Sequence, residues 1–366
     1  MKSSSGAHFI ALDHVRALAV FMVFAWHFTH AENGYPVPFE FVPIIPFSLL
    51  AEGHTGVALF MTLSGYLFAK LLDGKTIDYK AFLWNRALRL LPLLAVVLSF
   101  VGVLLFIKLG RVDFYIRSIA RGIVLPVLPN GGWSITAEFH FYVILPLLLW
   151  MMRKSRLLPL SVIAAAVLLR FFIHSEWGEV QSFAYLTLIG RIDQFVLGMV
   201  TYQCRSYIAR RHLVAITVLL AFAVFYWQFD LNGGLNQNPS YPSPSSIWIF
   251  LPAIEGLAYA VGIAWYDSSF SPSNKGNSWF IGKIGEYSYS IYLLHFFFVF
   301  RAARFVHENV MDMSNFYVAC LWSLTCFLAI MVPVGYLSYR FIESPFLKLR
   351  KPYILQPIAN LAWAQK

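Results

Sequence analysis

The chain has 366 residues, of which 59% are hydrophobic and only 13% are charged, and its mean hydropathy is +0.64. Soluble domains carry about 25% charged residues, so this composition excludes a soluble enzyme or binding module and predicts a protein that crosses a membrane many times. The net charge of +10 does not indicate a nucleic-acid partner, because Lys and Arg collect in the cytoplasmic loops of membrane proteins.

Ten stretches are apolar and long enough to cross a bilayer, which takes about 20 helical residues. We therefore expect an all-α polytopic integral membrane protein, a bundle of about ten transmembrane helices. A single transmembrane domain is predicted over residues 1–351, with a short tail at 352–366. The predicted spans are 11–29, 55–72, 88–109, 135–152, 157–173, 184–203, 212–230, 247–266, 285–303 and 316–340.

Basic residues predict the orientation of these spans. Nineteen Lys and Arg residues fall in segments on the N-terminal side of the membrane, and seven fall in segments on the other side. Because basic residues favour the cytoplasm, both termini are predicted to be cytoplasmic. Segment 116–128 is apolar enough for an extra or re-entrant span, which would reverse all later segments. The alternation of basic residues in the later loops favours ten spans.

The first span contains ionisable residues that are costly inside a bilayer. Arg16 and His27 are eleven residues apart, which places them on one helix face and about 16 Å apart along its axis. Asp13 lies within about 40° of the same stripe. Intramembrane polar residues normally face the bundle interior or a water-filled path. We expect this face to carry a cation near the cytoplasm and an imidazole toward the outer side, the alternative being a snorkelling Arg and an interfacial His.

The second and third spans add small and basic residues to this pattern. Ser64 and Gly65 lie within the second span, where small side chains let helices approach closely or let a ligand pass. Arg86 and Arg89 lie one turn apart at the cytoplasmic start of the third span. Two guanidinium groups on one face suit phosphate groups. They form a candidate anion site, although basic residues at this boundary also occur for orientation alone.

Polar residues also enter the fourth and sixth spans. Ser134, Glu138 and Tyr142 follow one another at i+4 spacing and therefore share a helix face. Glu138 in an apolar helix requires a partner, whether His, Arg or substrate. In the sixth span we expect Arg191 and Asp193 to form an internal polar pair.

His295 lies in the ninth predicted span, and Glu343 lies just after the tenth. His295 is expected to form a hydrogen bond within the core. Glu343 lies near the inner end of the last span, where it can pair with the inner arginines. The three cysteines do not have the spacing of metal ligands, and no metal is expected.

Six segments, taken in order over roughly residues 8–351, resemble the membrane acyltransferase family 3, which includes O-acetylases of bacterial surface polysaccharides. The first has the family's Arg and His separated by ten residues. Ala137 stands where the family often has a second acidic residue, so roles that need two carboxylates there are not expected. The six segments are LDHVRALAVFMVFAWH, LFMTLSGYLF, NRALRLLP, WSITAEFHFYVILPLLL, IGKIGEYSYSIYLLH and RFIESPF.

The resemblance implies acyl transfer from cytosolic acyl-CoA, most often acetyl-CoA, to a hydroxyl group. The polyanionic head of acetyl-CoA is then expected to bind Arg16, Arg86 and Arg89. Its thin arm is expected to pass between the first three spans, beside Ser64 and Gly65. No other cofactor is expected.

His27 is the expected catalytic residue, because an imidazole can remove a hydroxyl proton at neutral pH. A transiently acylated His27 is the alternative, and the sequence does not separate the two. Glu138 is expected to orient His27 or to bind the acceptor. The residues expected to support the site or contact the acceptor are Asp13, Trp133, Ser134 and Tyr142.

The expected acceptor is a surface or exported polysaccharide, or its lipid-linked precursor, at the bacterial inner membrane. The expected partners are thus acyl-CoA, a glycan or lipid-linked glycan, and membrane lipids. A macrolide or a lipid is the alternative acceptor. A proton-coupled secondary transporter is an alternative from another class, but the internal repeats common in transporters are not visible. A non-enzymatic subunit of a polysaccharide export machine is a further alternative.

Overall fold

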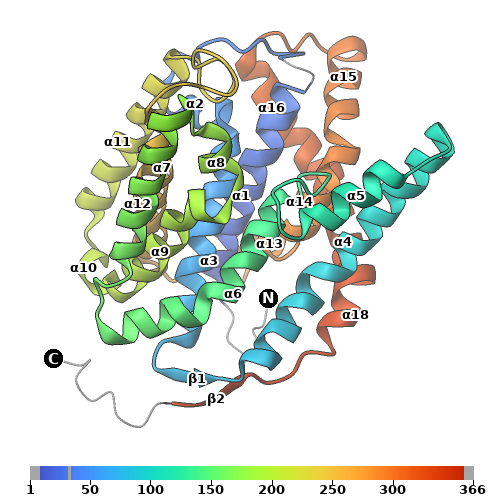
Figure 1. The fold of residues 1–366 in the computed structure, drawn as a ribbon. Coiled ribbons are helices and arrows are strands. Elements are labelled where there is room, and N and C mark those ends of the chain that lie inside the picture. The colour runs from blue at the N-terminus through green and yellow to red at the C-terminus, as the bar shows by residue number, and fades with distance from the viewer. Residues whose placement is uncertain (1–8, 32–33, 358–366) are drawn as a thin grey trace.

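A computed structural model describes residues 9–31 and 34–357 of the chain. In this part of the chain helices dominate and the strands are two short segments (Figure 1). The first half contains α1 (Ile10–Thr29), α2 (Ile45–Ala51), η1 (Gly53–Thr55), α3 (Gly56–Leu72), β1 (Lys75–Ile77), α4 (Tyr79–Leu109), α5 (Asp113–Gly122), α6 (Trp133–Lys154), α7 (Leu160–Trp177), α8 (Gln181–Leu186) and α9 (Leu188–Gln203). The second half contains α10 (Arg205–Ile208), α11 (His212–Leu231), α12 (Ile247–Ser269), α13 (Gly276–Glu286), α14 (Ser288–Leu294), η2 (His295–Phe297), α15 (Val299–Asn309), α16 (Phe316–Cys326), η3 (Phe327–Met331), α17 (Val332–Ser338), η4 (Tyr339–Glu343), α18 (Ser344–Leu347) and β2 (Ile354–Pro357).

The prediction of an all-α polytopic membrane protein is confirmed. Over the described residues, eight helices are long and apolar enough to span a membrane, and the bent pair α14–α15 makes a ninth candidate. The remaining predicted span, 184–203, corresponds to α8 and α9. Helix α9 has only 16 residues, and nearly all of them are buried by other helices. The total of ten spans and the cytoplasmic side of the termini stay predictions.

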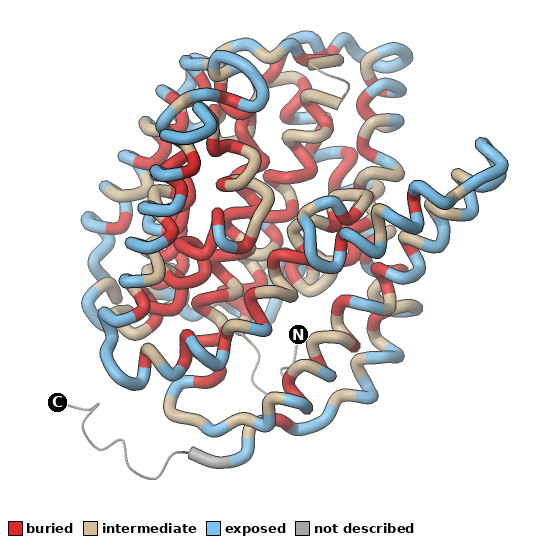
Figure 2. The backbone as a smooth tube through the Cα atoms, in the orientation of Figure 1, coloured by how far each residue is buried: buried red, intermediate tan, exposed pale blue. Residues whose placement is uncertain are grey.

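The centre of the bundle is formed by α1, α3, α9 and α12 (Figures 1 and 2). Glycines allow α3 and α9 to touch through their backbones. A Cβ atom at Gly65 would collide with the backbone of Phe195, and one at Gly198 would collide with the backbone of Thr62. Small residues are what close helix packing in a membrane requires. Gly65 therefore fixes the distance between the two helices.

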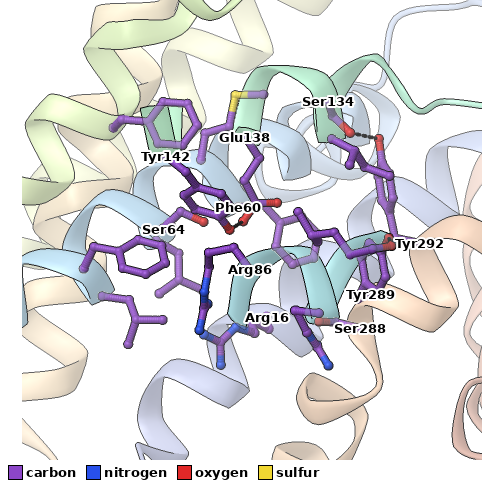
Figure 3. Close-up of a pocket in the computed structure, with 18 of the residues that line it drawn as sticks. Arg16, Phe60, Ser64, Arg86, Ser134, Glu138, Tyr142, Ser288, Tyr289 and Tyr292 are labelled. Carbon is purple, nitrogen blue, oxygen red and sulfur yellow. Dashed lines mark hydrogen bonds between the residues drawn. The ribbon is translucent and has the colours of Figure 1, made fainter. Parts of the chain in front are cut away.

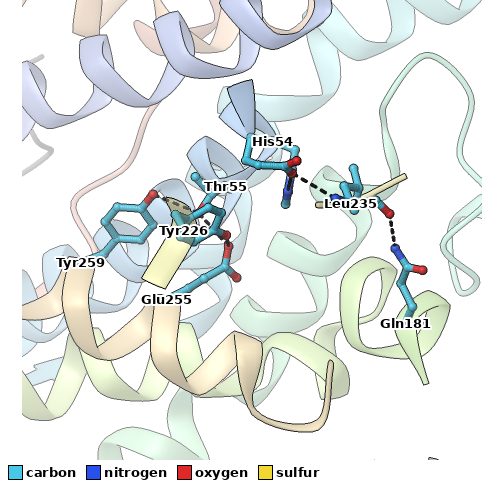
Figure 4. A network of polar contacts seen from close by, with 8 residues as sticks. His54, Thr55, Gln181, Tyr226, Leu235, Glu255 and Tyr259 are labelled. Carbon is cyan, nitrogen blue, oxygen red and sulfur yellow. Dashed lines mark hydrogen bonds and ion pairs between the residues drawn. The ribbon is translucent and has the colours of Figure 1, made fainter. Parts of the chain in front are cut away.

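A buried carboxylate joins four elements on the η1 side of this centre (Figure 4). Glu255 of α12 accepts hydrogen bonds from the Thr55 hydroxyl at 2.6 Å, the Tyr226 hydroxyl at 2.7 Å and the Gln194 amide at 2.8 Å. A buried carboxylate is tolerated when such donors surround it. Glu255 thus ties η1, α9 and α11 to α12.

A buried ion pair corrects one prediction. Asp193 pairs with Arg170 of α7, at 2.6 Å and 3.0 Å between guanidinium nitrogens and carboxylate oxygens, and not with Arg191. Residues two apart on a helix point in different directions. The guanidinium of Arg191 instead lies over the ring of Tyr185, 4.3 Å from its centroid.

Segment 116–128 contains no helix long enough to cross a bilayer. Helix α5 has ten residues, about 15 Å of length, which is half the thickness of a hydrocarbon core. It folds back along the end of α4, where the Tyr115 hydroxyl donates to the carbonyl of Leu98 at 3.0 Å (Figure 1). The following loop enters the bundle, and Asn130 donates to the carbonyl of Leu293 at 3.1 Å.

The ninth candidate span is broken at Phe298, where Ser288–Phe297 (α14 with η2) and α15 meet at a bend of 58°. A break of this kind leaves backbone carbonyls without helical donors. Side chains supply donors to two of them, from Asn130 to Leu293 and from His295 to Tyr292. The break therefore places polar groups next to the outer part of α1.

The chain after residue 351, predicted to be a short tail, packs on the domain as far as the structure describes it. Strand β2 pairs antiparallel with β1, and the Asp78 amide donates to the carbonyl of Tyr353 at 2.8 Å. Asn85 holds Lys351 through two hydrogen bonds, of 2.7 Å and 2.9 Å. Residues 358–366 of the predicted tail lie outside the described residues.

Candidate active site

A narrow pocket lies between α1, α3, α4, α6 and α14 (Figure 3). Its volume is about 170 Å³. It follows α3 from Val57 to Leu71, which is about 21 Å at 1.5 Å per residue. The pocket is therefore long and thin. Its polar lining consists of Asp13, Arg16, Ser64, Arg86, Arg89, Ser134, Glu138, Tyr142, Ser288, Tyr289, Tyr292 and Arg350.

Four arginines converge on the end of the pocket next to the start of α1 and the chain after α18. The structure brings Arg16, Arg86 and Arg89 together, as expected, and adds Arg350. Burial and the neighbouring Arg86 and Arg89 lower the pKa of Arg350 to about 10. Like charges held this close repel one another, so the cluster favours an anionic ligand.

The four arginines differ in their partners. Arg16 pairs with Asp13, and Arg89 pairs with Glu343 at 2.6 Å, which confirms the expected role of Glu343. Within the described residues, Arg86 and Arg350 have no ion-pair partner, and the buried Nε atom of each lacks a hydrogen bond. Buried donors without acceptors are rare in native proteins. These two side chains are the ones best placed to meet a phosphate.

The wall contributed by α6 carries the predicted polar face. Ser134, Glu138 and Tyr142 all line the pocket, and the Tyr142 hydroxyl donates to Glu138. At the far end, the hydroxyls of Ser134 and Tyr292 are 2.8 Å apart. The partner of Glu138 is thus a tyrosine, and the described contacts of Glu138 do not include His27.

Two predicted site residues, Gly65 and Trp133, lie outside the pocket. Gly65 faces the backbone of Phe195, so its role is helix packing. Trp133 lies outside the pocket against Tyr185, with 5.2 Å between ring centroids. Ala137 is buried among apolar residues.

His27 lies just beyond the far end of the pocket. Its ring centroid is 5.0 Å from that of His295, 4.7 Å from that of Phe296 and 4.5 Å from that of Trp26. The ring of Tyr292 lies 5.8 Å from that of His295. Tyr292 and His295 therefore form a layer between the pocket and His27.

His295 forms the predicted core hydrogen bond with one ring nitrogen, and its other ring nitrogen has no hydrogen bond in the described residues. Its Nδ1 atom is 2.5 Å from the carbonyl oxygen of Tyr292. Because a carbonyl only accepts, Nδ1 carries the proton, and in the neutral ring Nε2 is then an acceptor. This Nε2 atom is buried without a hydrogen bond in the described residues. The site thus holds two adjacent imidazoles at the end of a channel that begins with four arginines.

A comparison with protein families finds a match over most of the chain. The model of a family described as an acyltransferase domain matches residues 9–340. The chain belongs to acyltransferase family 3. The match contains every predicted site residue. Arg350, which the structure adds to the pocket, follows the matched region.

Curated members similar to this acyltransferase-family chain come from two bacteria. A protein of Staphylococcus aureus (strain COL) named as a putative O-acetyltransferase is 25% identical over 92% of this chain. The chain spans 57% of that protein's length. A protein of Komagataeibacter xylinus named as a putative membrane-bound transacylase is 25% identical over 67% of this chain and 66% of its own length. No solved structure matches the chain.

Sequence reasoning on this family member missed four residues of the site. Three of them stand in the segment YSYSIYLLH, which resembles the family: Tyr289, Tyr292 and His295. The repeated tyrosines of this segment were a signal of a polar helix face. Arg350 follows the last span in a run of basic residues. Such a run is expected on the cytoplasmic side of a membrane protein even without a ligand site. Its place in the pocket depends on the pairing of Asn85 with Lys351, which no local pattern predicts.

Proposed function

We propose that the protein is an acyl-CoA-dependent membrane O-acyltransferase of the bacterial inner membrane. It transfers an acetyl group from cytosolic acetyl-CoA to a hydroxyl of a surface or exported polysaccharide, or of its lipid-linked precursor. The observation that carries the proposal is the long pocket that begins at four arginines and ends beside His27 and His295. The names of the two relatives, an O-acetyltransferase and a transacylase, support the acetyl group.

The shape and charge of the pocket suit acetyl-CoA. The nucleotide head carries several negative charges, and Arg86 and Arg350 are arginines whose charge no ion pair offsets within the described residues. Guanidinium groups bind phosphates strongly through paired hydrogen bonds. The thin arm follows the 21 Å path along α3, which places the thioester at Tyr292 and Ser134. A movement of the Tyr292 side chain then brings the thioester to His27.

The chemistry at His27 is written for a hydroxyl acceptor. A ring nitrogen of His27 takes the hydroxyl proton while the oxygen attacks the thioester carbonyl. The carbon–sulfur bond then breaks, the acyl group stays on the oxygen, and the proton passes to the CoA thiolate. In the covalent variant, the His27 nitrogen attacks first and releases CoA, and the acceptor oxygen then displaces the imidazole.

Purified protein in proteoliposomes provides the test. CoA release is followed with a thiol reagent after addition of acetyl-CoA and glycan acceptors, and the acetylated product is identified by mass spectrometry. His27→Ala is expected to abolish both signals while the variant still elutes as a single species. The matched control is His212→Ala, because His212 is exposed and lies next to Trp265 far from the pocket. Wild-type activity in His27→Ala would overturn the proposal.

The same preparation separates the two chemical variants. Incubation with radiolabelled acetyl-CoA but no acceptor, followed by rapid denaturation near neutral pH, traps an acetyl-imidazole if one forms. Labelled protein that His27→Ala cannot form supports the covalent variant. Absence of both a CoA burst and labelled protein supports direct transfer, which needs the acceptor before CoA is released.

A further inference from the structure

A large groove opens beside the pocket, between the outer half of α4 and α15. Its volume is about 1020 Å³. The described residues of α4 that are buried end at Val97, and beyond that point α4 and α5 lean away from α15 (Figures 1 and 2). Six phenylalanines line the groove, and they are Phe100, Phe296, Phe297, Phe298, Phe300 and Phe305.

The groove reaches the catalytic histidine from the side. Phe296 and Phe300 line the groove, and both rings touch His27, with centroids at 4.7 Å and 6.0 Å. The α4 side of the groove is exposed, with Phe100 at 52% and Leu104 at 47% of full exposure. In a membrane, such a surface faces lipid tails. The groove therefore connects the hydrocarbon layer with His27 by a path separate from the pocket for acetyl-CoA.

Two positive charges lie on the outer side of this groove. Arg301 and Arg304 stand three residues apart on α15 and both line it. Basic residues are disfavoured on the predicted outer side, so their presence calls for a reason other than orientation. Glu308, one turn further along α15, also lines the groove, so the described lining contains two arginines and one glutamate.

The depth of these charges matches that of the histidine. His27 is 17 residues from the start of α1, about 26 Å along a helix of about 30 Å. It therefore lies near the outer boundary of the hydrocarbon layer, where lipid phosphates are found. Arg301 directly follows Phe300, which contacts the His27 ring.

We propose that the groove between α4 and α15 binds a polyprenyl phosphate-linked or pyrophosphate-linked glycan, with its isoprenoid chain against the phenylalanines and its phosphate at Arg301 and Arg304. The hydroxyl to be acylated then lies next to His27. This inference rests on the proposed function and names the form in which the acceptor arrives.

The apolar lining and the two arginines favour this occupant over others. A free polysaccharide does not need an apolar groove. A neutral lipid does not need two arginines, which bind phosphate oxygens through charge-assisted hydrogen bonds.

Binding is tested separately from catalysis. Protein in detergent is mixed with equal amounts of a long-chain polyprenyl phosphate and of phosphatidylglycerol, and retention of each is measured by native mass spectrometry. We expect at least tenfold preferential retention of the polyprenyl phosphate. Arg301→Ala with Arg304→Ala is expected to reduce that preference at least tenfold, and the Lys pair at the same positions is expected to keep most of it.

The matched control is the pair Arg117→Ala with Arg121→Ala, which removes two exposed arginines from α5 on the same predicted side. It is expected to leave retention unchanged. Folding of every variant is checked by binding of acetyl-CoA, because the groove arginines do not line the acetyl-CoA pocket.

Two results would overturn the inference. One is equal retention of phosphatidylglycerol and polyprenyl phosphate, which would make the groove an ordinary lipid contact. The other is unchanged preference in the Arg301→Ala, Arg304→Ala variant. Absence of acetyl-CoA turnover by the wild type would instead contradict the proposed function. Lipid retention does not depend on turnover, so it tests the groove separately.

Discussion

The imidazole rings of His27 and His295 lie 5.0 Å apart between centroids, although 268 residues separate them in the chain. The break between α14 and α15 makes this contact possible, because it turns His295 toward α1 while its Nδ1 atom binds the carbonyl of Tyr292. The Nε2 atom of His295 is left as an acceptor next to His27. In the proposed mechanism, His295 is therefore a positioning residue that fixes which nitrogen of His27 takes the hydroxyl proton.

His295→Ala is expected to lower kcat about 100-fold, within the range for losing effective acid–base catalysis. The KM for acetyl-CoA is expected to stay near its wild-type value, because His295 does not line the pocket. Steady-state CoA release measures both constants. His295→Gln, which retains an acceptor atom, is expected to recover part of the lost rate. An unchanged kcat in His295→Ala would remove His295 from the mechanism.

The arginine cluster predicts the opposite kinetic pattern. Arg86→Ala and Arg350→Ala are each expected to raise the KM for acetyl-CoA roughly 10- to 100-fold, the loss of one or two hydrogen bonds to a charged group. A smaller change in kcat is expected, since uniform binding is removed. Arg205→Ala is the matched control, because Arg205 lies over the ring of Tyr202 outside the pocket. A fall in kcat with constant KM would contradict a role in binding the CoA head.

The membrane spans could be predicted well from the sequence, because the apolar stretches are long and turn-rich segments separate them. It also placed Arg16, Arg86, Arg89 and Glu138 correctly around one pocket, since helical spacing puts them on inward faces. Helical spacing cannot show which helices are neighbours.

The residues that sequence reasoning misplaced depend on such tertiary contacts. Asp193 pairs with Arg170 because α7 packs on α9. Gly65 faces α9 and not the ligand. His295 reaches His27 through a helix break that hydropathy does not reveal. Arg350 reaches the pocket because the chain after α18 returns to pair with β1.

Glu52 predicts a pH-dependent stability. Its carboxylate accepts from the Leu235 amide at 3.1 Å and lies 2.8 Å from Nε2 of His54. Burial raises the pKa of Glu52 from 4.5 to about 8, and the hydrogen bond from Leu235 opposes this only in part. The folded state thus favours the protonated form. The corresponding stabilisation is complete below about pH 4.5 and is lost as the pH rises through about 8.

When the pH rises from 5 to 8, the thermal midpoint of the wild type is expected to decrease more than that of Glu52→Gln. The expected difference is on the order of 2–4 °C, because the Gln side chain is neutral at every pH. Thermal scans of both proteins in the same detergent measure the difference. Glu176→Gln is the control, because Glu176 is exposed on α7. Parallel curves for the wild type and Glu52→Gln would contradict the raised pKa.

The ion pair between Arg170 and Asp193 predicts a large loss of stability when one partner is removed. Both side chains are fully buried, and Arg170 also donates to the carbonyls of Ile249 and Gly190 at 2.8 Å and 2.7 Å. Asp193→Ala leaves an uncompensated buried charge, which costs about 3–5 kcal/mol. Denaturant titration followed by tryptophan fluorescence measures the free energy of unfolding.

The exposed pair between Arg117 and Asp113 on α5 provides the comparison for this measurement, because both of its side chains are more than half exposed. Asp113→Ala is expected to change the free energy of unfolding by about 1 kcal/mol or less. The double variant Arg170→Met with Asp193→Leu removes both charges at once and is expected to recover much of the stability that Asp193→Ala loses. Equal losses of unfolding free energy for the buried and exposed single variants would contradict this prediction. They would show that water or lipid headgroups solvate the Arg170 guanidinium, because solvation removes the cost of a buried unpaired charge.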